Sequence, residues 1–532
     1  MYKRQIRNRE AAYHPKHDAY KWWVLANVMI GTFMAVLDAT IVNVGLPKIM
    51  AAFGVGLDTI EWVLTAYMLA MAVMLPTSGW LADKFGLKKI YFLGLLVFTL
   101  GSALCGLSGT ENMLIIARVI QGLGAGALMP LGMAIVMREF PPHQRGIAMG
   151  FWSIASAASV SFGPLIGGYL VDNYNWQLIF DVNIPVGILG LFATFIIQKE
   201  YVNLNVKKFD IIGFISISTF LPLVIFGLTE GNSASNAEGW SAPYILLCFG
   251  IAAIALAVFI TTEFIVENPL IDVKLLWNHN FGISNIIMFI FGMGMFGSTF
   301  LLPVYLQNGL GYSAIQSGAV FLPAGIIQGA TSPLIGYISD KVSRKLPIIL
   351  GIILFAISFY INSSLSFMSE HSYIMLSLYI RGFALAMIFT PMMTIAILEI
   401  PRDKMAQASS IFNTVRQLGG SFGVAILGTV LTSRVAYHIQ MFGADVSRNS
   451  PAFKNTVKSF GYFIQHVTGS NAFIAGRQGQ ALLTAHISQQ AFIQGIDDDF
   501  LIAAIITIIA LVPVLFLHSK KKVDLQDVAG YK

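Results

Sequence analysis

The chain has 532 residues, of which 56% are hydrophobic and only 11% are charged, and its mean hydropathy is +0.71. Soluble domains carry about 25% charged residues, so this composition cannot cover the surface of a soluble protein. A soluble enzyme and a nucleic-acid-binding protein are excluded despite the net charge of +6, because membrane proteins concentrate Lys and Arg in their loops. Cys105 and Cys248 both lie in apolar segments, so no disulfide framework or metal-ligand pair is predicted. The composition predicts an all-α polytopic membrane protein.

Fourteen apolar segments are long enough to cross a membrane. A transmembrane helix needs roughly 20 mainly apolar residues. Because the N-terminus lacks a short apolar core followed by a small-residue cleavage site, we expect no removable signal peptide. The predicted spans lie near 22–46, 60–80, 89–108, 112–137, 147–171, 178–197, 209–229, 243–265, 281–307, 315–337, 346–366, 373–398, 406–433 and 499–517.

The distribution of Lys and Arg supports an even number of spans. If both termini are cytoplasmic, 24 Lys and Arg lie in the inner tails and loops, whereas the short outer loops before the last one contain only Lys48. Cytoplasmic loops carry such an excess of positive charge, and long outer loops translocate largely regardless of theirs. An odd number of spans would disrupt this alternation. We therefore expect a multi-pass protein of the cell (inner) membrane with both termini cytoplasmic.

Short motifs recur in the second half of the chain at an offset of about 257–260 residues. Gly79–Lys84 (GWLADK) returns as Gly336–Lys341 (GYISDK), and Ser161–Gly163 returns as Ser421–Gly423. Chance similarity is the alternative, but the same order at one offset argues against it. Two like-oriented six-helix bundles with a substrate site between them form a transporter architecture. We predict a cytoplasmic tail at 1–21, a bundle at 22–200, two inserted helices at 201–275, a second bundle at 276–517 with a long outer loop at 435–498, and a tail at 518–532.

Asp38 is the only acid well inside a span of either bundle. A charge at the centre of a membrane helix costs about 2.5–3.5 kcal/mol on insertion scales, so such residues usually face a cavity or pair with one another. Counted at about 1.5 Å per residue, Asp38 and Arg118 reach a similar depth in the outer third of the membrane. Two hypotheses follow. Either Asp38 carries protons or couples to substrate, or it forms a fixed structural bridge with Arg118.

Several polar side chains are candidates for a central substrate cavity. Arg381 reaches nearly the same depth as Asp38 and Arg416 falls near mid-membrane, so we expect the acid and these guanidiniums to face one cavity. Gln121 shares a helix face with Arg118. A single acid suits lipophilic cations, whereas the arginines suit amphipathic anions, and both substrate classes stay open. The predicted cavity residues are Asn43, Trp62, Tyr67, Gln121, Arg381, Asn413 and Arg416.

A short charged segment, Asp83–Lys89, joins the second and third spans on the inner side. Its charges are suited to locking two helices together when the cytoplasmic side is closed; a topogenic loop without a gating role is the alternative. In the fifth span, small residues four apart and a helix breaker favour a sliding, bent interface. The predicted gate residues are Gly79, Asp83, Lys84, Gly86 and Lys88, and those of the fifth-span interface are Gly163, Pro164, Gly167 and Gly168.

The long outer segment is unusual for a chain with mostly short loops. Pro451 is predicted to open a helix, and Ala481–Ile496 has a helical composition that continues into the last span. His466 and His486 are scattered, so no metal site is predicted. A lid over the exit or a docking surface for a periplasmic adaptor is one interpretation, and a tolerated insertion is the other.

Six motifs resemble signatures of a known family. Leu37–Pro47 (LDATIVNVGLP) resembles the first-span signature of the fourteen-span drug:proton antiporters of the major facilitator superfamily. Gly79–Lys89 (GWLADKFGLKK) is similar to the superfamily's loop 2–3 signature, and Arg118–Gly126 (RVIQGLGAG) is similar to its fourth-span signature. The antiporter element of the fifth span and two further elements of this EmrB/QacA-like group are resembled by Gly163–Gly168 (GPLIGG), Phe180–Pro185 (FDVNIP) and Asn413–Gly423 (NTVRQLGGSFG).

The resemblance implies efflux of hydrophobic or amphipathic compounds in exchange for protons, without a cofactor. It implies proton coupling through Asp38, a proton-relay or gating role for Arg118, and a gate-locking role for Asp83. The implied partners are the substrate, protons and the lipid bilayer, with a periplasmic adaptor and an outer-membrane channel as candidates; no nucleic acid is expected.

Other functions find less support in the sequence. The chain has no GxxxxGK[ST] phosphate loop and no cytoplasmic segment long enough to bind a nucleotide, so neither an ATP-driven pump nor an enzyme is expected. The nearest alternative is a proton-coupled importer of a nutrient or metabolite from the same superfamily; the fifth-span element and the fourteen spans favour the exporter. There are mild departures from the family pattern: Gly45 replaces a frequent Ala, and Lys84 and Lys88 replace frequent Arg, which forms a more rigid ion pair.

Overall fold

The computed structural model describes residues 18–518 apart from residue 56 and the segments 203–208, 232–235, 237, 267–268, 446–450 and 470. Within these residues no strand occurs, and 14 helices are long and apolar enough to cross a membrane. The predicted all-α, fourteen-span fold is confirmed. The helices are α2 (Asp18–Phe53), α3 (Leu57–Phe85), α4 (Leu87–Gly106), α5 (Glu111–Glu139), α6 (Arg145–Asn173), α7 (Leu178–Asp181), α8 (Asn183–Ile197), α9 (Ile211–Glu230), α10 (Pro243–Ile265), α11 (His279–Val304), α12 (Ala314–Ala319), α13 (Leu322–Lys341), α14 (Lys345–Asn362), α15 (His371–Leu398), α16 (Met405–Asp445), α17 (Pro451–Thr468), α18 (Ala472–Ile509) and α19 (Leu511–Leu515).

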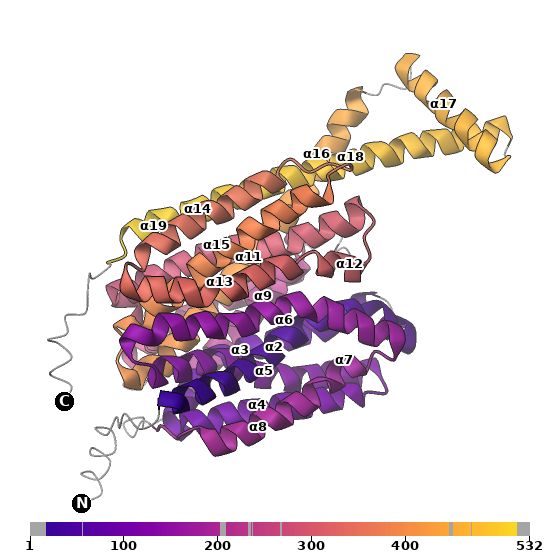
Figure 1. Cartoon of the computed structure of the whole chain (residues 1–532). Coiled ribbons are helices and arrows are strands. Elements are labelled where there is room, and N and C mark those ends of the chain that lie inside the picture. Colours follow the sequence, from indigo (N-terminus) through magenta and orange to yellow (C-terminus); the bar gives the residue numbers. More distant parts are fainter. Residues whose placement is uncertain are drawn as a thin grey trace, which may run out of the picture.

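The long helices form two groups that lie side by side (Figure 1). In the first group α3 and α4 pack on α5, and α2 packs on α6. In the second group α11 packs on α16, and α14 packs on α15. We call the end of the molecule at which α2 begins and α19 ends the basal end, and we call the opposite end, which carries α17, the distal end (Figure 1).

Two pairs of helices, α6 with α13 and α3 with α16, form the seams between the groups. Near the basal end of the first seam, a Cβ added to Gly336 would lie 2.2 Å from the carbonyl oxygen of Gly146. Across the second seam, the Ser410 hydroxyl donates a hydrogen bond to the carbonyl oxygen of Leu75. The backbones of the two groups therefore touch directly at both seams.

The two additional helices, α9 and α10, lie beside the second seam. The helix α10 packs on α9, and α9 contacts both α3 and α16. Phe226 in α9 stacks on Trp62 in α3 with the ring centroids 5.8 Å apart. Trp240, which precedes α10, donates a hydrogen bond of 2.9 Å to the Thr429 hydroxyl in α16. This inserted pair therefore bridges the two groups along one side.

The segment predicted as a long outer loop is largely helical. Pro451 is the first residue of α17, and α18 runs from this segment into the last span without a break, as the sequence predicted. With 41 and 38 residues, α16 and α18 are each about 60 Å long, roughly twice the thickness of the hydrocarbon core. They therefore project beyond the bundle together with α17 (Figure 1). Among the described residues, no group of three or more His, Cys, Asp or Glu is arranged to hold a metal ion.

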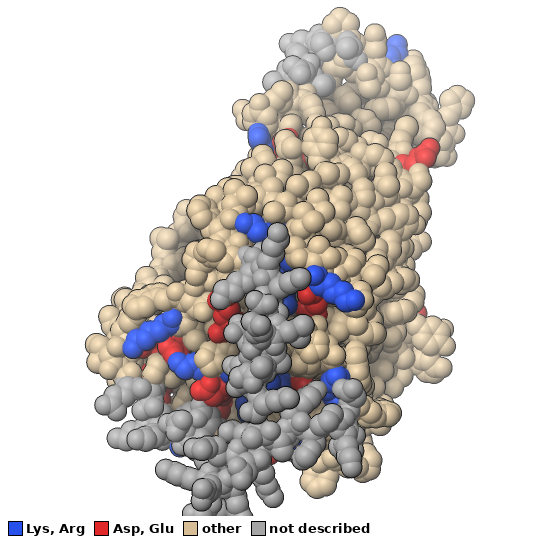
Figure 2. All heavy atoms as spheres, turned by 60° about the vertical axis from the view of Figure 1, so that its left-hand side comes forward, with Lys and Arg blue, Asp and Glu red and all other residues tan. Residues whose placement is uncertain are grey.

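Charged side chains gather at the basal end. Figure 2, in which this end is turned forward, shows Lys, Arg, Asp and Glu close together there and a wide uncharged surface beyond them. Such an uncharged band is what a lipid-facing surface requires, because charges are costly in the hydrocarbon.

Candidate functional site

A buried ion pair lies inside the first group of helices. Arg118 Nη1 of α5 lies 2.5 Å from Asp38 Oδ2 of α2, and both side chains are 0% exposed. Asp38 Oδ1 accepts further hydrogen bonds from Gln121 Nε2 at 2.7 Å and from Asn183 Nδ2 at 3.2 Å. Side chains of α5 and α8 thus surround one carboxylate of α2, and their hydrogen bonds offset part of the cost of removing it from water.

Arg118, like Asp38, is fixed by several contacts with neighbouring helices. Its Nε donates to the Val63 carbonyl oxygen at 3.0 Å, and its guanidinium lies over the Tyr67 ring, 4.0 Å from the centroid. Gln121 accepts a hydrogen bond from Arg118 Nη1 at 2.6 Å and donates one to Ser102 Oγ at 2.6 Å. Arg118 Nη2 is buried and has no partner among the described residues. Asn183 Oδ1 is likewise buried without a partner in the described ranges, so the network is closed except for this donor and this acceptor.

Close backbone approaches place these side chains. A Cβ on Gly101 of α4 would lie 2.6 Å from the Cα of Gln121, and one on Gly122 of α5 would lie 2.5 Å from the Tyr67 carbonyl oxygen. Helices approach this closely only where small residues meet. The small residues of the fourth-span motif therefore let α3 and α4 close on α5 around its two functional side chains.

The geometry bears on both hypotheses for Asp38. The bridge to Arg118 is present, and in this conformation neither side chain reaches solvent. Protonation of the carboxylate would leave the guanidinium buried and uncompensated, which is strongly unfavourable. A proton on Asp38 therefore favours a different arrangement of α2, α5 and α8. A structural bridge of this kind is at the same time suited to couple protonation to conformation.

Only part of the predicted cavity lies at this ion pair. Tyr67 and Gln121 contact it directly. Trp62 is 41% exposed and stacks on Phe226 of α9, and Asn43 is exposed on α2. Neither Trp62 nor Asn43 belongs to the hydrogen-bond network around the acid. The structure thus separates these two residues from the ion pair.

Arg381 lies in α15, the fourth span of the second group, as Arg118 lies in the fourth span of the first group, and it has no acidic partner among the described residues. Its Nη2 donates to Thr299 Oγ1 of α11 at 2.7 Å, and its guanidinium lies 5.6 Å from the Phe321 ring centroid. Its Nη1 is buried without a partner in the described part of the chain. None of the ion pairs between described residues includes Arg381. The acid and this guanidinium do not share one site.

Arg416 and Asn413 lie where α16 faces α5 of the other group. Arg416 Nη2 lies 3.8 Å from Met129 Sδ, and Asn413 Nδ2 lies 3.7 Å from Met133 Sδ. A thioether sulfur is only a weak acceptor. Within the described ranges, Arg416 Nε and Asn413 Oδ1 are buried without any partner. This polar pair therefore reaches across the interface with much of its hydrogen-bonding capacity unused.

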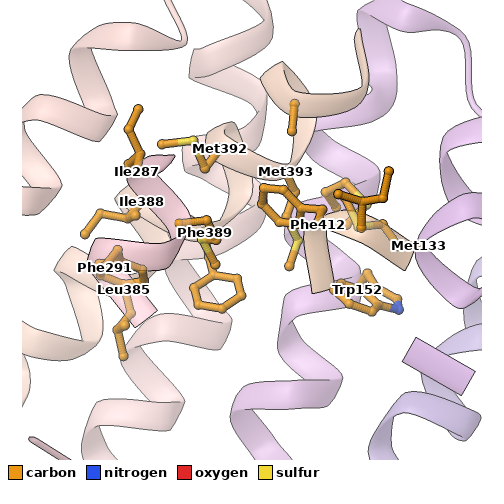
Figure 3. Close-up of a cluster of buried hydrophobic side chains, with 14 of the residues drawn as sticks. Met133, Trp152, Ile287, Phe291, Leu385, Ile388, Phe389, Met392, Met393 and Phe412 are labelled. Carbon is orange, nitrogen blue, oxygen red and sulfur yellow. The ribbon is translucent and has the colours of Figure 1, made fainter. Parts of the chain in front are cut away.

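An apolar cluster fills the interface next to this polar pair. Figure 3 shows Met133 and Trp152 of the first group beside Phe412 of the second, with Phe389 and Met393 of α15 further along the cluster. These side chains are each at most 8% exposed. Closely packed apolar side chains leave no room for water. The interface is therefore closed at this level in the present conformation.

The predicted gate residue Asp83 lies at the basal end of the α3–α16 seam. It is 7% exposed, and the Gln407 side chain in the first turn of α16 hydrogen-bonds its carboxylate. A Cβ on Gly79 would lie 3.0 Å from the Gln407 Cα and 3.1 Å from the Ala406 carbonyl oxygen. The first residues of the motif thus hold α3 directly against the start of α16.

The repeated motif does the same at the other seam. Asp340 Oδ2 accepts hydrogen bonds from the backbone N–H groups of Gly146 at 2.9 Å and Ile147 at 3.3 Å, in the first turn of α6. Its Oδ1 accepts one from Arg344 at 3.2 Å. A carboxylate at a helix N-terminus is stabilised by the unpaired N–H groups and the helix dipole. Asp340 was not among the predicted site residues, although the internal repeat places it opposite Asp83.

Two further predicted gate residues, Gly86 and Lys88, lie at the turn between α3 and α4. Gly86 has a φ of 111°, a conformation that side chains disfavour. The Glu200 carboxylate accepts hydrogen bonds from the backbone N–H groups of Lys88 at 3.1 Å and Lys89 at 3.2 Å, and Lys88 Nζ donates to the Phe195 carbonyl oxygen at 2.7 Å. Glu200 therefore caps α4. Sequence reasoning missed it, because its partners lie more than a hundred residues earlier in the chain.

The predicted antiporter motif of α6 packs on both groups. Its Gly163 and Gly167 face Thr40 and Ile41 of α2, in its own group. Across the seam, a Cβ on Gly168 would lie 2.3 Å from Ile315 Cγ1 of α12. Pro164 of the same motif faces Gly318 of α12. The motif thus packs α6 closely against α2 on one side and against α12 of the second group on the other.

Two groups of membrane helices, a buried ion pair between membrane helices and paired carboxylate contacts at one end of the seams are features of a membrane transporter. A sequence model of the Major Facilitator Superfamily matches residues 28–424. The solved structure of the proton:xylose symporter XylE shares this fold with a TM-score of 0.58 and 14% identity, covering 94% of this chain and 97% of the symporter.

The sequence relatives narrow the assignment. The chain is 30% identical over 507 residues to the uncharacterized MFS-type transporter YhcA of Bacillus subtilis, which covers 94% of this chain and 93% of the relative. It is 31% identical over 453 residues to the multidrug export protein EmrB of Escherichia coli K12, which covers 83% of this chain and 86% of EmrB. The chain belongs to the Major Facilitator Superfamily and, within it, to the EmrB-like drug:proton antiporters.

Proposed function

We propose that the chain exports hydrophobic or amphipathic compounds across the cell membrane in exchange for protons, with its basal end and both termini in the cytoplasm. The charged basal surface supports this orientation, because cytoplasmic loops of membrane proteins carry the excess of Lys and Arg (Figure 2). The direction of transport is supported by relatives named multidrug export proteins. No cofactor is required, since the proton gradient supplies the energy.

Transport proceeds by alternating access between the two groups of helices. The basal contacts of Asp83 with α16 and of Asp340 with α6 close the cytoplasmic side. In contrast, α2 and α11, the first helices of the two groups, pack mainly on helices of their own group. This arrangement supports a state that is closed to the cytoplasm. Separation of the groups on the distal side then opens the path by which substrate is released and a proton enters from outside.

Protonation of Asp38 then drives the return to the inward-facing state. The neutral acid no longer compensates Arg118, so the closed network of α2, α5 and α8 loses stability relative to a rearranged one. Deprotonation toward the cytoplasm restores the pair. The single observation that carries this proposal is the fully buried Asp38–Arg118 pair, in which one proton changes the charge balance of the bundle core.

The energy of one proton is sufficient for efflux. A proton entering through 100 mV releases about 2.3 kcal/mol, apart from any pH gradient. At about 1.4 kcal/mol per tenfold concentration ratio, one proton supports a gradient of roughly fifty-fold for a neutral substrate.

The proposal is tested by dye transport in inside-out proteoliposomes containing the wild-type chain. An acidic lumen should drive accumulation of an amphipathic dye, and collapse of the pH step with a protonophore should release it. Dye accumulation only when the external side is acidic would identify an importer and refute export. Dye accumulation that is independent of the pH step would refute proton coupling.

The projecting ends of α16 and α18 and the hairpin helix α17 are the candidate docking surface for a periplasmic adaptor, which in turn would lead to an outer-membrane channel. The projection extends beyond the thickness of a bilayer, as such a contact needs (Figure 1). Deletion of residues 446–470 should leave transport in proteoliposomes intact and abolish co-purification of an adaptor. Loss of transport in the purified deletion variant would instead assign α17 to the transport cycle.

A further inference from the structure

The buried charges of the two groups are not equivalent. In the first group the carboxylate of Asp38 is neutralised by Arg118 at 2.5 Å. In the second group Arg381 and Arg416 are 5% and 7% exposed, and neither takes part in an ion pair with a described residue. A buried guanidinium without a counter-ion is costly, so it is retained where it binds something. The transmembrane interior therefore carries an excess of positive charge on the side of the second group.

Arg416 is the better placed of the two arginines to meet a substrate. Its guanidinium lies at the interface of the two groups, with Met129 of α5 on one side and the Phe389 ring centroid of α15 at 5.5 Å on another. Its Nε is buried without a partner among the described residues. Asn413 lies one helical turn away, and its Nδ2 donates to the Met133 thioether and the Ser409 carbonyl oxygen, while its Oδ1 has no partner in the described ranges. Hydrogen-bond donors that now face only weak acceptors gain free energy when a ligand offers a stronger acceptor.

Arg381 adds a second positive charge on the distal side of Arg416. It lies eight residues before Phe389 on α15, which is about 12 Å along the helix. Its Nη1 is also buried without a partner in the described part of the chain. An anion entering the interface would thus meet positive charge at two levels, which strengthens its attraction in a medium of low dielectric.

The acids of the described spans do not offer an equivalent site for a cation. Asp38 is already paired with Arg118. Glu263 is buried on α10, outside the interface, and its carboxylate accepts hydrogen bonds from the Ile271 N–H. Asp499 is buried on α18, which packs on α11, α14 and α16 of the second group. Both carboxylate oxygens of Asp499 lack a partner among the described residues, but its helix packs on helices of the second group. A cationic substrate at the interface would therefore face the guanidinium of Arg416 and none of these three carboxylates.

We propose that the substrate is an amphipathic anion, such as a lipophilic carboxylate or sulfonate, whose charged group binds Arg416 and Asn413 in place of the methionine sulfurs. This inference rests on the proposed export function and specifies its substrate class. The neighbouring side chains of Met129, Met133, Phe389 and Phe412 accommodate the apolar body once the groups separate, because methionine adapts to ligands of different shape. A bidentate guanidinium contact suits a planar carboxylate.

The test compares two dyes that share the xanthene ring system and differ in charge, fluorescein as the anion and rhodamine 6G as the cation. Inside-out proteoliposomes containing the full chain are given an acidic lumen, and the initial uptake of each dye is measured over a concentration series. We expect the wild type to take up fluorescein in preference to rhodamine 6G. Arg416→Gln should raise the KM for fluorescein about tenfold or more, as expected for loss of a charged hydrogen bond, and Arg416→Lys should restore part of it.

Two controls separate binding from folding. Arg434 is a 45%-exposed arginine of the same helix that pairs with Asp498, and Arg434→Gln should leave fluorescein uptake unchanged. Rhodamine 6G uptake should not fall in Arg416→Gln, whereas a merely misfolded variant would lose both dyes. Unchanged fluorescein kinetics in Arg416→Gln would overturn the assignment of the site. Uptake of rhodamine 6G alone by the wild type would overturn the anion class and leave proton-driven export standing, and uptake of neither dye would overturn both.

Discussion

Arg118 and Arg381, which lie in the fourth span of the first and of the second group, occupy opposite environments. Arg118 is fully buried and contacts an acid, a glutamine, a backbone carbonyl and an aromatic ring. Arg381 is also buried, but it donates a hydrogen bond to a threonine hydroxyl, and one of its nitrogens has no partner among the described residues. A symmetric scaffold has thus become asymmetric in its charges. In the mechanism proposed above, the first group holds the proton-sensitive contact and the second group offers hydrogen-bond donors to a ligand.

The largest expected effect is a difference in stability between the variants Arg118→Gln and Arg381→Gln. Arg118→Gln leaves the Asp38 carboxylate buried without its counter-ion, and breaking such a pair costs about 3–5 kcal/mol. Arg381→Gln removes an unpaired buried charge and should be nearly neutral for stability. Thermal unfolding of the purified proteins in detergent measures both effects. Equal losses of stability in the two variants would contradict the difference between the sites.

The double variant Asp38→Asn/Arg118→Gln should recover much of the stability lost in Arg118→Gln. With both charges absent, no buried carboxylate remains uncompensated, and residues in direct contact typically show coupling of about 0.5–3 kcal/mol. The unfolding temperatures of the wild type, the two single variants and the double variant give this coupling. Strict additivity of the two substitutions would show that the ion pair is energetically unimportant.

Unlike the two arginines, the two basal carboxylates, Asp83 and Asp340, should give similar effects when they are replaced. Asp83→Asn and Asp340→Asn each weaken one seam at the basal end, and loss of a charged hydrogen bond costs about 1.5–3 kcal/mol. We expect transport to fall about tenfold in each variant at normal insertion. A cysteine introduced at Ala406, which is 6% exposed, should react faster with a water-soluble thiol reagent from the basal side in both backgrounds. A change in only one background would show that the seams are not equivalent.

The smallest effect is expected at the turn that supports the first gate. Gly86→Ala places a side chain at a φ of 111° and close to the Glu200 carboxylate, which should cost about 1–2 kcal/mol. Gly109→Ala is the matched control, because no other group lies within 4 Å of its added Cβ. Thermal unfolding again provides the measurement. Equal stability of the two alanine variants would remove the structural reason for glycine in this motif.

Much of the fold and part of the site could be predicted from the sequence. Hydropathy and charge defined the fourteen spans, and counting residues along the helices placed Asp38 and Arg118 at one depth. The same counting gave Arg381 a similar depth, but depth says nothing about the direction in which a side chain points around its helix, and this guanidinium contacts Thr299 and Phe321 of the second group. The contact of Trp62 with Phe226 of the inserted helices could not be predicted, because their position is not encoded in its local sequence.

Two residues of the basal contacts, Asp340 and Glu200, were not predicted from the sequence. The internal repeat relates the motif of Asp340 to that of Asp83, so the contact of Asp340 at the second seam follows from the sequence by analogy with Asp83. Glu200 was not predictable, because it caps α4 from the far end of the first group and belongs to no local pattern. Local motifs identify what a helix end needs, and only the tertiary structure shows which residue supplies it.

The most direct test of the central claim records luminal pH and dye accumulation together in inside-out proteoliposomes containing the wild type or Asp38→Asn. In the wild type, dye uptake should be accompanied by an outflow of protons from the acidic lumen that stops when the dye is absent. In Asp38→Asn, dye should equilibrate across the membrane without accumulating and without moving protons. A stable Asp38→Asn protein that still accumulates dye and releases protons at the wild-type rate would contradict the account and assign proton coupling to another residue.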